Sequence, residues 1–288
     1  MDAERSSSAV VWLVCPASSP GRFGAARRSG ADVALLDLED SVPAARKDAA
    51  RGAVADWLAQ PSQDKTRRCE GVRVNGLGTS AGLKDLVALA ERGLRPAVVL
   101  VPKAESARDI EIVAEVTGLA EGGERRVWAL IETPRGVRNL DAILASPVLA
   151  GVAFGAADYA AASGIALSPR ALWHPRAAVT AGASAAGLPA LDSPGFDLSG
   201  GEELRREAQE AAELGFAGKV AVHPRQIPVI REAFRPSTEA LAHARDVVAA
   251  ADAADGEITA VGGLMVGPPL VSAARALARR AASYPSTT

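Results

Sequence analysis

The sequence predicts an α/β protein in which a (β/α)8 TIM barrel is followed by a C-terminal helical extension. The length of 288 residues suits one large barrel as well as two ordinary domains. Eight short apolar runs occur in order, each followed by a helical pattern or a long loop, and charged residues gather where the runs end. We expect residues 1–234 to form a catalytic barrel domain. Residues 235–288 should form a helical arm or lid that packs on the barrel or on a neighbouring subunit.

The apolar runs are assigned to strands because they are short and are bounded by turn residues or by charge. The expected strands span residues 9–15, 33–40, 71–75, 97–105, 128–131, 151–154, 188–192 and 218–224. The first run is short, is preceded by two acids and runs into Pro16, so we interpret it as a strand and not as a signal peptide.

The segments between these strands predict helices from their amphipathic pattern and their end signals. The expected helices span residues 22–29, 44–58, 82–92, 107–117, 137–144, 169–186 and 202–214. Residues 60–68 and 121–126 are polar and are expected to be surface loops. In the extension, helices over residues 238–251 and 270–282 should be joined by a glycine-containing segment. The extension has no room for a large core of its own.

Composition narrows the class of protein. The formal net charge is −2 and no basic stripe is present, which argues against nucleic acid or an anionic membrane as a partner. No apolar run approaches the roughly 20 residues that a transmembrane helix needs. The only two cysteines, Cys15 and Cys69, cannot form a disulfide framework, so we expect free thiols and a cytoplasmic location.

The stretch over residues 128–159 predicts a strand, a loop, a helix and a second strand, with Glu132 after the first strand and Asp158 after the second. Such a crossover makes the strands parallel, so both acids should lie at the same sheet edge. An oxygen-only pair suits Mg²⁺, which typically takes one or two carboxylates and keeps its waters. Two unrelated loop acids would give the same spacing, and both interpretations stay open at this point.

Other polar residues also fall at the expected carboxyl ends of strands. They are Asp37, Glu39, Asp40, Arg73, Lys103, Glu105, Asp192 and His223. A guanidinium such as that of Arg73 is either neutralised by neighbouring carboxylates or grips a substrate carboxylate, and we favour the second role. A structural role for His223 is at least as plausible as hydrogen bonding in the barrel mouth.

Two motif-based alternatives are disfavoured. Residues 78–82 match the nucleophile-elbow pattern of serine hydrolases, but the strand has already ended at Asn75, and Thr79 or Ser80 suits a helix N-cap. The three histidines are too dispersed for a zinc site, and no HExxH or CxxC motif exists.

With these residues assembled, the sequence resembles the citrate lyase beta-subunit-like proteins of the HpcH/HpaI aldolase superfamily over nearly its whole length. The segments that carry the resemblance are Leu36-Asp-Leu-Glu-Asp-Ser-Val42, Val72-Arg-Val-Asn75, Val101-Pro-Lys-Ala-Glu-Ser106, Ala129-Leu-Ile-Glu-Thr133, Phe154-Gly-Ala-Ala-Asp158-Tyr159, Gly187-Leu-Pro-Ala-Leu-Asp192 and Gly218-Lys-Val-Ala-Val-His-Pro224, together with Pro16-Ala-Ser18 and Arg22-Phe23.

The resemblance implies a Mg²⁺-dependent carbon–carbon lyase, usually a homotrimer, that acts on short hydroxyacyl-CoA thioesters such as malyl-, citramalyl- or citryl-CoA. It implies that Glu132 and Asp158 bind Mg²⁺. Arg73, Lys103 and Arg22 would bind the substrate, the keto acid or CoA thioester. Arg73 would also take part in catalysis, with Glu39 and Asp40 supporting the metal site.

Two departures from the family pattern bear on activity. The tail motif, which carries an aspartate in related malyl- and citramalyl-thioester lyases, reads Met265-Val-Gly-Pro-Pro269, so Gly267 offers no acid or base. General acid–base help is worth about 10²- to 10⁴-fold, and Asp255 or Glu257 would have to replace it. The first loop reads Ser19-Pro-Gly-Arg-Phe23 in place of the family's Arg-Pro-Glu-Arg-Phe, and we expect this change to alter recognition of the thioester phosphates.

The sequence is therefore compatible with three functions. The leading hypothesis is the Mg²⁺-dependent lyase. The alternatives are an acyl-CoA thioesterase, in which metal-positioned water attacks the acyl carbon, and a catalytically weakened subunit that binds a CoA ester or an acidic metabolite. Gly267 favours the weakened subunit, whereas the presence of Glu132, Asp158 and Arg73 argues against complete loss of activity.

Overall fold

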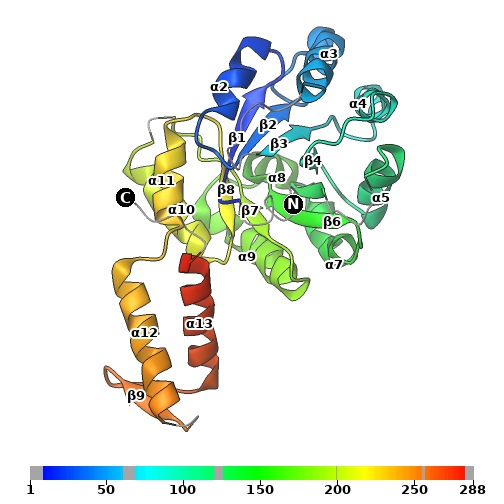
Figure 1. Cartoon of the computed structure of the whole chain (residues 1–288). Helices are drawn as coiled ribbons and strands as arrows, with labels where there is room; N and C mark the ends of the chain where they lie inside the picture. Colours follow the sequence, from blue (N-terminus) through cyan, green and yellow to red (C-terminus); the bar gives the residue numbers. More distant parts are fainter. Residues whose placement is uncertain (1–8, 61–68, 120–125, 199, 255–256, 283–288) are drawn as a thin grey trace. The chain divides into compact units, whose positions relative to one another are not determined.

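The computed structural model describes residues 9–60, 69–119, 126–198, 200–254 and 257–282, and these form two compact units, Met1–Arg231 and Glu232–Thr288. In the first unit eight parallel strands close into a barrel in sequence order, with helices around it (Figure 1). Closure comes from pairing of the first strand with the last, in the register Val11 with Lys219. The predicted (β/α)8 barrel is confirmed. The assignment of residues 1–234 to a catalytic barrel domain and of residues 235–288 to an arm or lid stays a prediction.

The strands are mostly buried on both faces, as parallel strands covered by helices must be, and this explains their near-continuous apolar sequences. They are β1 (Val11–Pro16), β2 (Val33–Asp37), β3 (Cys69–Arg73), β4 (Val98–Val101), β5 (Val127–Ile131), β6 (Leu149–Phe154), β7 (Ala190–Asp192) and β8 (Gly218–Ala221). Several strands end earlier than predicted, because the chain leaves the sheet there to form the loops of the site.

Four of the helices around the barrel begin at a side-chain cap. Thr79, Ser106, Thr133 and Ser168 each accept a hydrogen bond from a backbone N–H in the following turn. The helical elements are η1 (Pro20–Arg22), α2 (Phe23–Arg27), η2 (Ala44–Arg46), α3 (Lys47–Leu58), α4 (Ser80–Glu91), α5 (Ala107–Val116), α6 (Pro134–Arg138), α7 (Leu140–Leu144), α8 (Ala156–Ser163), α9 (Pro169–Ala185), α10 (Glu202–Glu213) and α11 (Gln226–Ala233).

The helix expected over residues 137–144 is two short helices, α6 and α7. Asn139 lies between them with φ −99° and ψ 14°, and its side-chain amide donates to the backbone carbonyl of Glu105 at 2.8 Å. The backbone hydrogen bonds on both sides of Asn139 remain helical, so the break is a local departure from helical dihedral angles. The expected loops over residues 60–68 and 121–126 lie almost entirely outside the described residues.

Two tryptophans fill the barrel interior. The rings of Trp12 and Trp128 meet edge to face with centroids 4.6 Å apart. Gly151 pairs with Trp128 across the sheet, and a Cβ at this glycine would lie 2.5 Å from the indole, so only glycine fits there. Cys15 and Cys69 are buried and form no disulfide, and burial raises the pKa of the Cys15 thiol to about 11, which keeps it protonated.

The second unit consists of two helices and a small hairpin. Its elements are α12 (Thr238–Ala253), β9 (Thr259–Val261), β10 (Leu264–Val266) and α13 (Pro268–Ala282). The segment between the helices is an antiparallel hairpin, because Gly262 and Gly263 both adopt positive φ and form a two-residue turn between the strands. The buried core is small, as expected, and consists of Ala244, Val247, Val266 and Ala274. No helix in the described part of the chain has the length and hydropathy needed to cross a bilayer.

Candidate active site

A cluster of charged side chains lies at the carboxyl ends of β2 to β5. Asp37 ends β2 and Arg73 ends β3, and these two residues are register partners. Glu132 directly follows β5 and Lys103 lies two residues after β4. Asp158 is not at a strand end as expected; it lies in the first turn of α8, after a short loop from β6. The sequence prediction that Glu132 and Asp158 share one edge is confirmed, because both lie within 4 Å of Lys103 Nζ.

Arg73 is held by carboxylates. Its Nε and Nη2 donate to the two carboxylate oxygens of Asp37 at 2.6 and 2.8 Å, and Nη1 lies 2.9 Å from Glu39 Oε2 and 3.5 Å from Asp40 Oδ2. Burial alone would raise the pKa of Asp37, but the hydrogen bonds and charge of Arg73 outweigh burial and hold this pKa below its ordinary value. The structure therefore shows the neutralised arrangement that the sequence analysis set aside, and substrate binding by Arg73 stays a prediction.

Lys103 lies at the centre of the acidic side chains. Its Nζ donates to Glu39 Oε1 at 2.6 Å and lies 3.6 Å from Asp158 Oδ1 and 3.8 Å from Glu132 Oε1. Its backbone N–H donates to Glu132 Oε1 at 2.9 Å. Lys103 has φ +50°, a left-handed conformation that costs a lysine on the order of 1–2 kcal/mol. Its two bonds, one from the backbone and one from the ammonium, offset that strain.

Glu132 is 1% exposed. Burial, followed by the negative charge of Glu39, raises the pKa of Glu132 to about 8, and the lysine opposes this shift only in part. A Cβ at Gly155 would lie 2.5 Å from both Cβ and Oε2 of Glu132, so a glycine is required for the acid to fit beside α8. Burial and the neighbouring charge of Glu39 therefore favour the protonated form of this carboxyl when no cation is bound.

Glu39 is also buried, and burial raises its pKa despite the nearby Arg73 and Lys103. Its Oε2 lies close to Arg73 but without hydrogen-bond alignment, so this buried oxygen has no hydrogen-bond donor among the described residues. Such an oxygen costs free energy unless another group binds it. It is therefore a candidate to accept a proton or a hydrogen bond from a bound molecule.

The donor set fits Mg²⁺. Three carboxylates, those of Glu39, Glu132 and Asp158, lie within 4 Å of Lys103 Nζ, and all offered atoms are hard oxygens. In the described part of the chain, no three His, Cys, Asp or Glu side chains are arranged as a complete metal-binding group. A cation that keeps several waters, as Mg²⁺ does, needs no such complete group.

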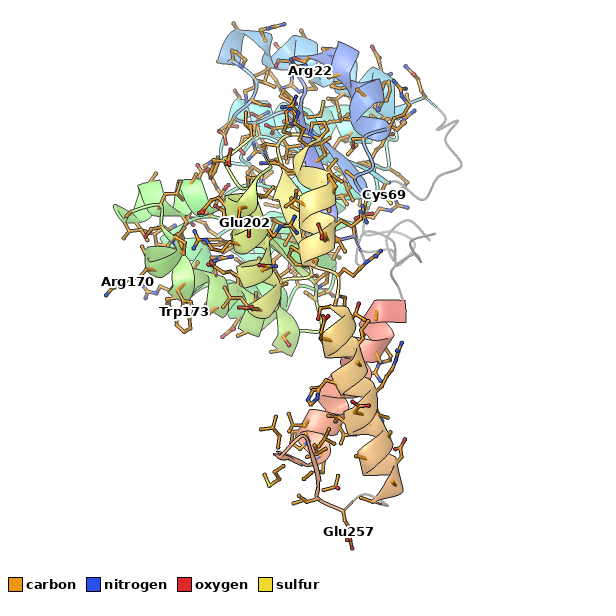
Figure 2. All side chains as sticks on the ribbon, turned by 90° about the vertical axis from the view of Figure 1, so that its left-hand side faces the viewer. Arg22, Cys69, Arg170, Trp173, Glu202 and Glu257 are labelled. Atoms are coloured by element: carbon orange, nitrogen blue, oxygen red, sulfur yellow. The ribbon has the colours of Figure 1, made fainter. Side chains whose placement is uncertain are left out.

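The remaining predicted residues are dispersed. The side chain of Asp40 is 58% exposed at the edge of the cluster, and Arg22 is exposed at the end of η1 (Figure 2). His223 Nδ1 accepts from the backbone N–H of Arg225 at 3.1 Å, which is a loop-stabilising contact. Glu105 accepts from Thr133 Oγ1 at 2.8 Å beside α6.

Asp192 ends β7, as expected, but its side chain is not part of the charged cluster. It is buried against the helical layer, where it accepts from Arg176 of α9 at 3.1 and 3.0 Å and from Lys219 at 2.7 Å. This ion-pair network was not anticipated from the sequence. It tethers α9 and β8 to β7 on the outside of the barrel wall.

Sequence reasoning also missed a support for the site. Lys47 Nζ donates to the carbonyls of Leu38 and Glu39 and to Asn75 Oδ1, and Asn75 in turn donates to Asp85. These bonds fix the loop that presents Glu39. The position of Asn75 just beyond a strand was the available signal.

The barrel fold and this charged cluster define an enzyme that works at the carboxyl ends of its strands with hard-oxygen ligands. The chain belongs to the HpcH/HpaI aldolase/citrate lyase family, whose model matches residues 9–224. It is 42% identical to the citrate lyase subunit beta-like protein of Mycobacterium tuberculosis over 277 residues, 94% of each chain. It is 35% identical to the L-malyl-CoA/beta-methylmalyl-CoA lyase of Rhodobacter capsulatus over 271 residues, 85% of each.

A solved structure of this family has a similar fold. The CitE protein of Mycobacterium tuberculosis, crystallised with magnesium, acetoacetate and coenzyme A, is 40% identical. It superposes with a TM-score of 0.82 over 97% of this chain and 100% of that chain. The family and its members are carbon–carbon lyases, and the chain is an enzyme of this class.

Proposed function

We propose that the protein is a Mg²⁺-dependent lyase that cleaves, or forms, a short hydroxyacyl-CoA thioester such as malyl-, citramalyl- or citryl-CoA, with a keto acid and an acyl-CoA as the other partners. The observation that carries this proposal is the convergence of Glu132 and Asp158 on one point at the barrel mouth. The magnesium and coenzyme A bound by the CitE relative support it.

Glu132 and Asp158 would hold the metal. When bound, Mg²⁺ would supply Lewis-acid polarisation of a keto-acid oxygen. Arg73 would bind the carboxylate of the keto acid while Asp37 fixes the plane of the guanidinium from behind. Arg22, exposed at the end of η1, would meet the thioester phosphates.

Carbon–carbon cleavage needs a group that takes the proton of the substrate hydroxyl. Gly267 cannot do this from the tail motif, Glu257 is exposed at the hairpin end of the second unit (Figure 2), and Asp255 lies outside the described residues. Glu39 has a raised pKa and an oxygen, Oε2, that accepts no hydrogen bond among the described residues although it lies 2.9 Å from Arg73 Nη1, and Asp40 lies beside it. Under this proposal Glu39 takes the proton and Lys103 orients its carboxylate.

A homotrimer, with the arm covering the barrel or a neighbouring subunit, is part of the same proposal. Each unit by itself leaves large apolar side chains exposed. On the barrel unit these include Leu167, Trp173, Phe196 and Leu198, and on the second unit they include Ile258, Leu264, Met265 and Leu270. Trp173 is 59% exposed and projects outward from α9 (Figure 2), as a side chain at a subunit contact would. Sedimentation analysis measures the assembly state directly.

The test is release of keto acid from malyl-, citramalyl- and citryl-CoA in the presence of Mg²⁺ or a chelator. Keto-acid release that requires Mg²⁺ and is lost in Glu132→Gln supports the lyase, and the thioester that is cleaved identifies the acyl group of the substrate. Binding of the thioester without any release would instead support the weakened binding subunit, which the missing side chain of Gly267 favours. Release of free CoA without keto acid would support the thioesterase.

A further inference from the structure

The ammonium of Lys103 occupies the space between the acids that would hold the metal. Among the described residues, no other lysine or arginine lies within 4 Å of Glu132 or Asp158. The three carboxylates around Lys103 Nζ come from three separate elements, and the lysine is the group that all three share. Its positive charge offsets the mutual repulsion of these carboxylates.

A lysine ammonium and a divalent cation cannot both occupy this position. Two positive charges a few ångströms apart in a partly buried site repel strongly, and each needs the same oxygens. The side chain of Lys103 is 42% exposed, so its head can move away from Glu132 and Asp158 while it keeps its bond to Glu39. Its backbone N–H keeps the bond to Glu132 Oε1 in either position.

We propose that Lys103 is an internal counter-cation of the metal site, which balances the charge of Asp158, and that of Glu132 once this acid has lost its proton, when no metal is present, and must withdraw from both when Mg²⁺ binds. This inference rests on the proposed function, since it takes these two acids as the metal ligands. Lys103 is a positioning residue in this role. It weakens the intrinsic affinity for Mg²⁺ and keeps its ammonium with Glu39 after the exchange.

The left-handed backbone of Lys103 supports this role. At φ +50° asparagine or glycine would be less strained, so the lysine is not explained by the turn alone. The conformation directs the side chain back over Glu132, whose carboxylate the same residue already holds through its N–H. One residue thereby fixes the ligand through its backbone and balances its charge through its side chain.

The experiment is Mg²⁺ titration by calorimetry, with Mn²⁺ followed by electron paramagnetic resonance as a second probe, on wild type, Lys103→Met, Lys103→Arg and Lys84→Met. Lys84 is an exposed lysine on α4, 3.9 Å from Asp48, and is the matched control for loss of one positive charge. Affinities are compared at a pH above which they no longer rise, so that protons on Glu132 do not compete.

Lys103→Met should bind Mg²⁺ at least about tenfold more tightly than wild type, because the displaced charge is gone. Lys103→Arg, which keeps the charge, and Lys84→Met should stay within about threefold of wild type. Equal or weaker binding by Lys103→Met would overturn the proposal and leave the lysine a structural ion-pair partner. If Lys103→Met does not fold, Lys103→Gly removes the same charge and relieves the backbone strain, and the same increase is expected.

Failure of the underlying metal assignment would look different. If wild type and Glu132→Gln bind Mg²⁺ equally, or neither binds it, then Glu132 is not a metal ligand and the proposed function loses its support. If wild type binds, Glu132→Gln does not, and Lys103→Met is unchanged, only the role of Lys103 is rejected.

Discussion

Glu132→Gln tests the charge balance of the site through the pH dependence of stability. Burial raises the pKa of Glu132 from 4.5 to about 8 in the metal-free protein. Between these values the folded protein keeps a proton that the unfolded chain has released, so the free energy of unfolding falls as the pH rises through this window. At about 1.4 kcal/mol per pKa unit, the loss is about 3 kcal/mol by pH 7 and approaches about 5 kcal/mol above pH 8.

Urea unfolding of chelator-treated protein, at about pH 5 to pH 9, measures this loss. Glutamine keeps the size of the side chain and cannot release a proton. The variant should therefore match wild type near pH 5 and exceed it by several kcal/mol near pH 9. Parallel pH profiles of the two proteins would refute the reasoning, because they would show that Glu132 does not carry the proton.

Magnesium should reverse the wild-type loss. A cation that binds the charged form of Glu132 in the folded protein stabilises that protein by mass action. Added Mg²⁺ should therefore raise wild-type stability near pH 9 and leave Glu132→Gln nearly unchanged. An equal gain for both proteins would place the cation elsewhere.

Three further predictions follow from the same geometry. Gly267→Asp should raise turnover in the keto-acid release assay if the missing tail acid limits the reaction, and it should not lower the melting temperature, because no atom outside its chain neighbours lies closer than 4.0 Å to the new Cβ. Unchanged turnover would leave the proton transfer with Glu39. Gly155→Ala should displace Glu132 and so lower the Mg²⁺ affinity measured by calorimetry at least about tenfold. The control is Gly52→Ala, at a helical position with open space around it. This variant should raise the free energy of unfolding in urea by about 0.5–1 kcal/mol. Arg73→Lys should lose about 1–3 kcal/mol of stability and more than about 10²-fold in turnover, since an ammonium cannot replace the bidentate guanidinium; full activity would exclude a substrate role.

The barrel was predictable because parallel strands covered by helices leave long apolar runs in the sequence. The meeting of Glu132 and Asp158 was predictable because a crossover places both strand ends at one edge. The hairpin of the second unit was missed, although the Gly262-Gly263 pair between two short strands was a usable signal. The predicted strand boundaries were wrong mainly at the carboxyl ends, where the predicted strands included loop residues that follow the sheet.

The contacts within the site could not be predicted without knowing the register of the strands. Arg73 meets Asp37 because the two residues are direct partners between β2 and β3, which no single-sequence pattern specifies. Asp192 faces the helices because its neighbour Leu191 belongs to the interior cluster, and successive side chains alternate between faces. A one-residue change in register would have exchanged these faces, and no local sequence pattern indicates which register forms.

The pairing of β1 with β8 also governs how the chain reaches its native state. Val11 meets Lys219 only after almost the whole barrel has been synthesised, so β1 keeps an open edge until β8 has left the ribosome. Contacts between residues so distant in sequence must overcome loop-closure entropy before they stabilise the fold, which makes closure a slow step. During that interval the unpaired edge is open to association with other chains. Conditions that slow synthesis of residues near β8 should therefore lower the yield of soluble protein more than changes elsewhere in the barrel.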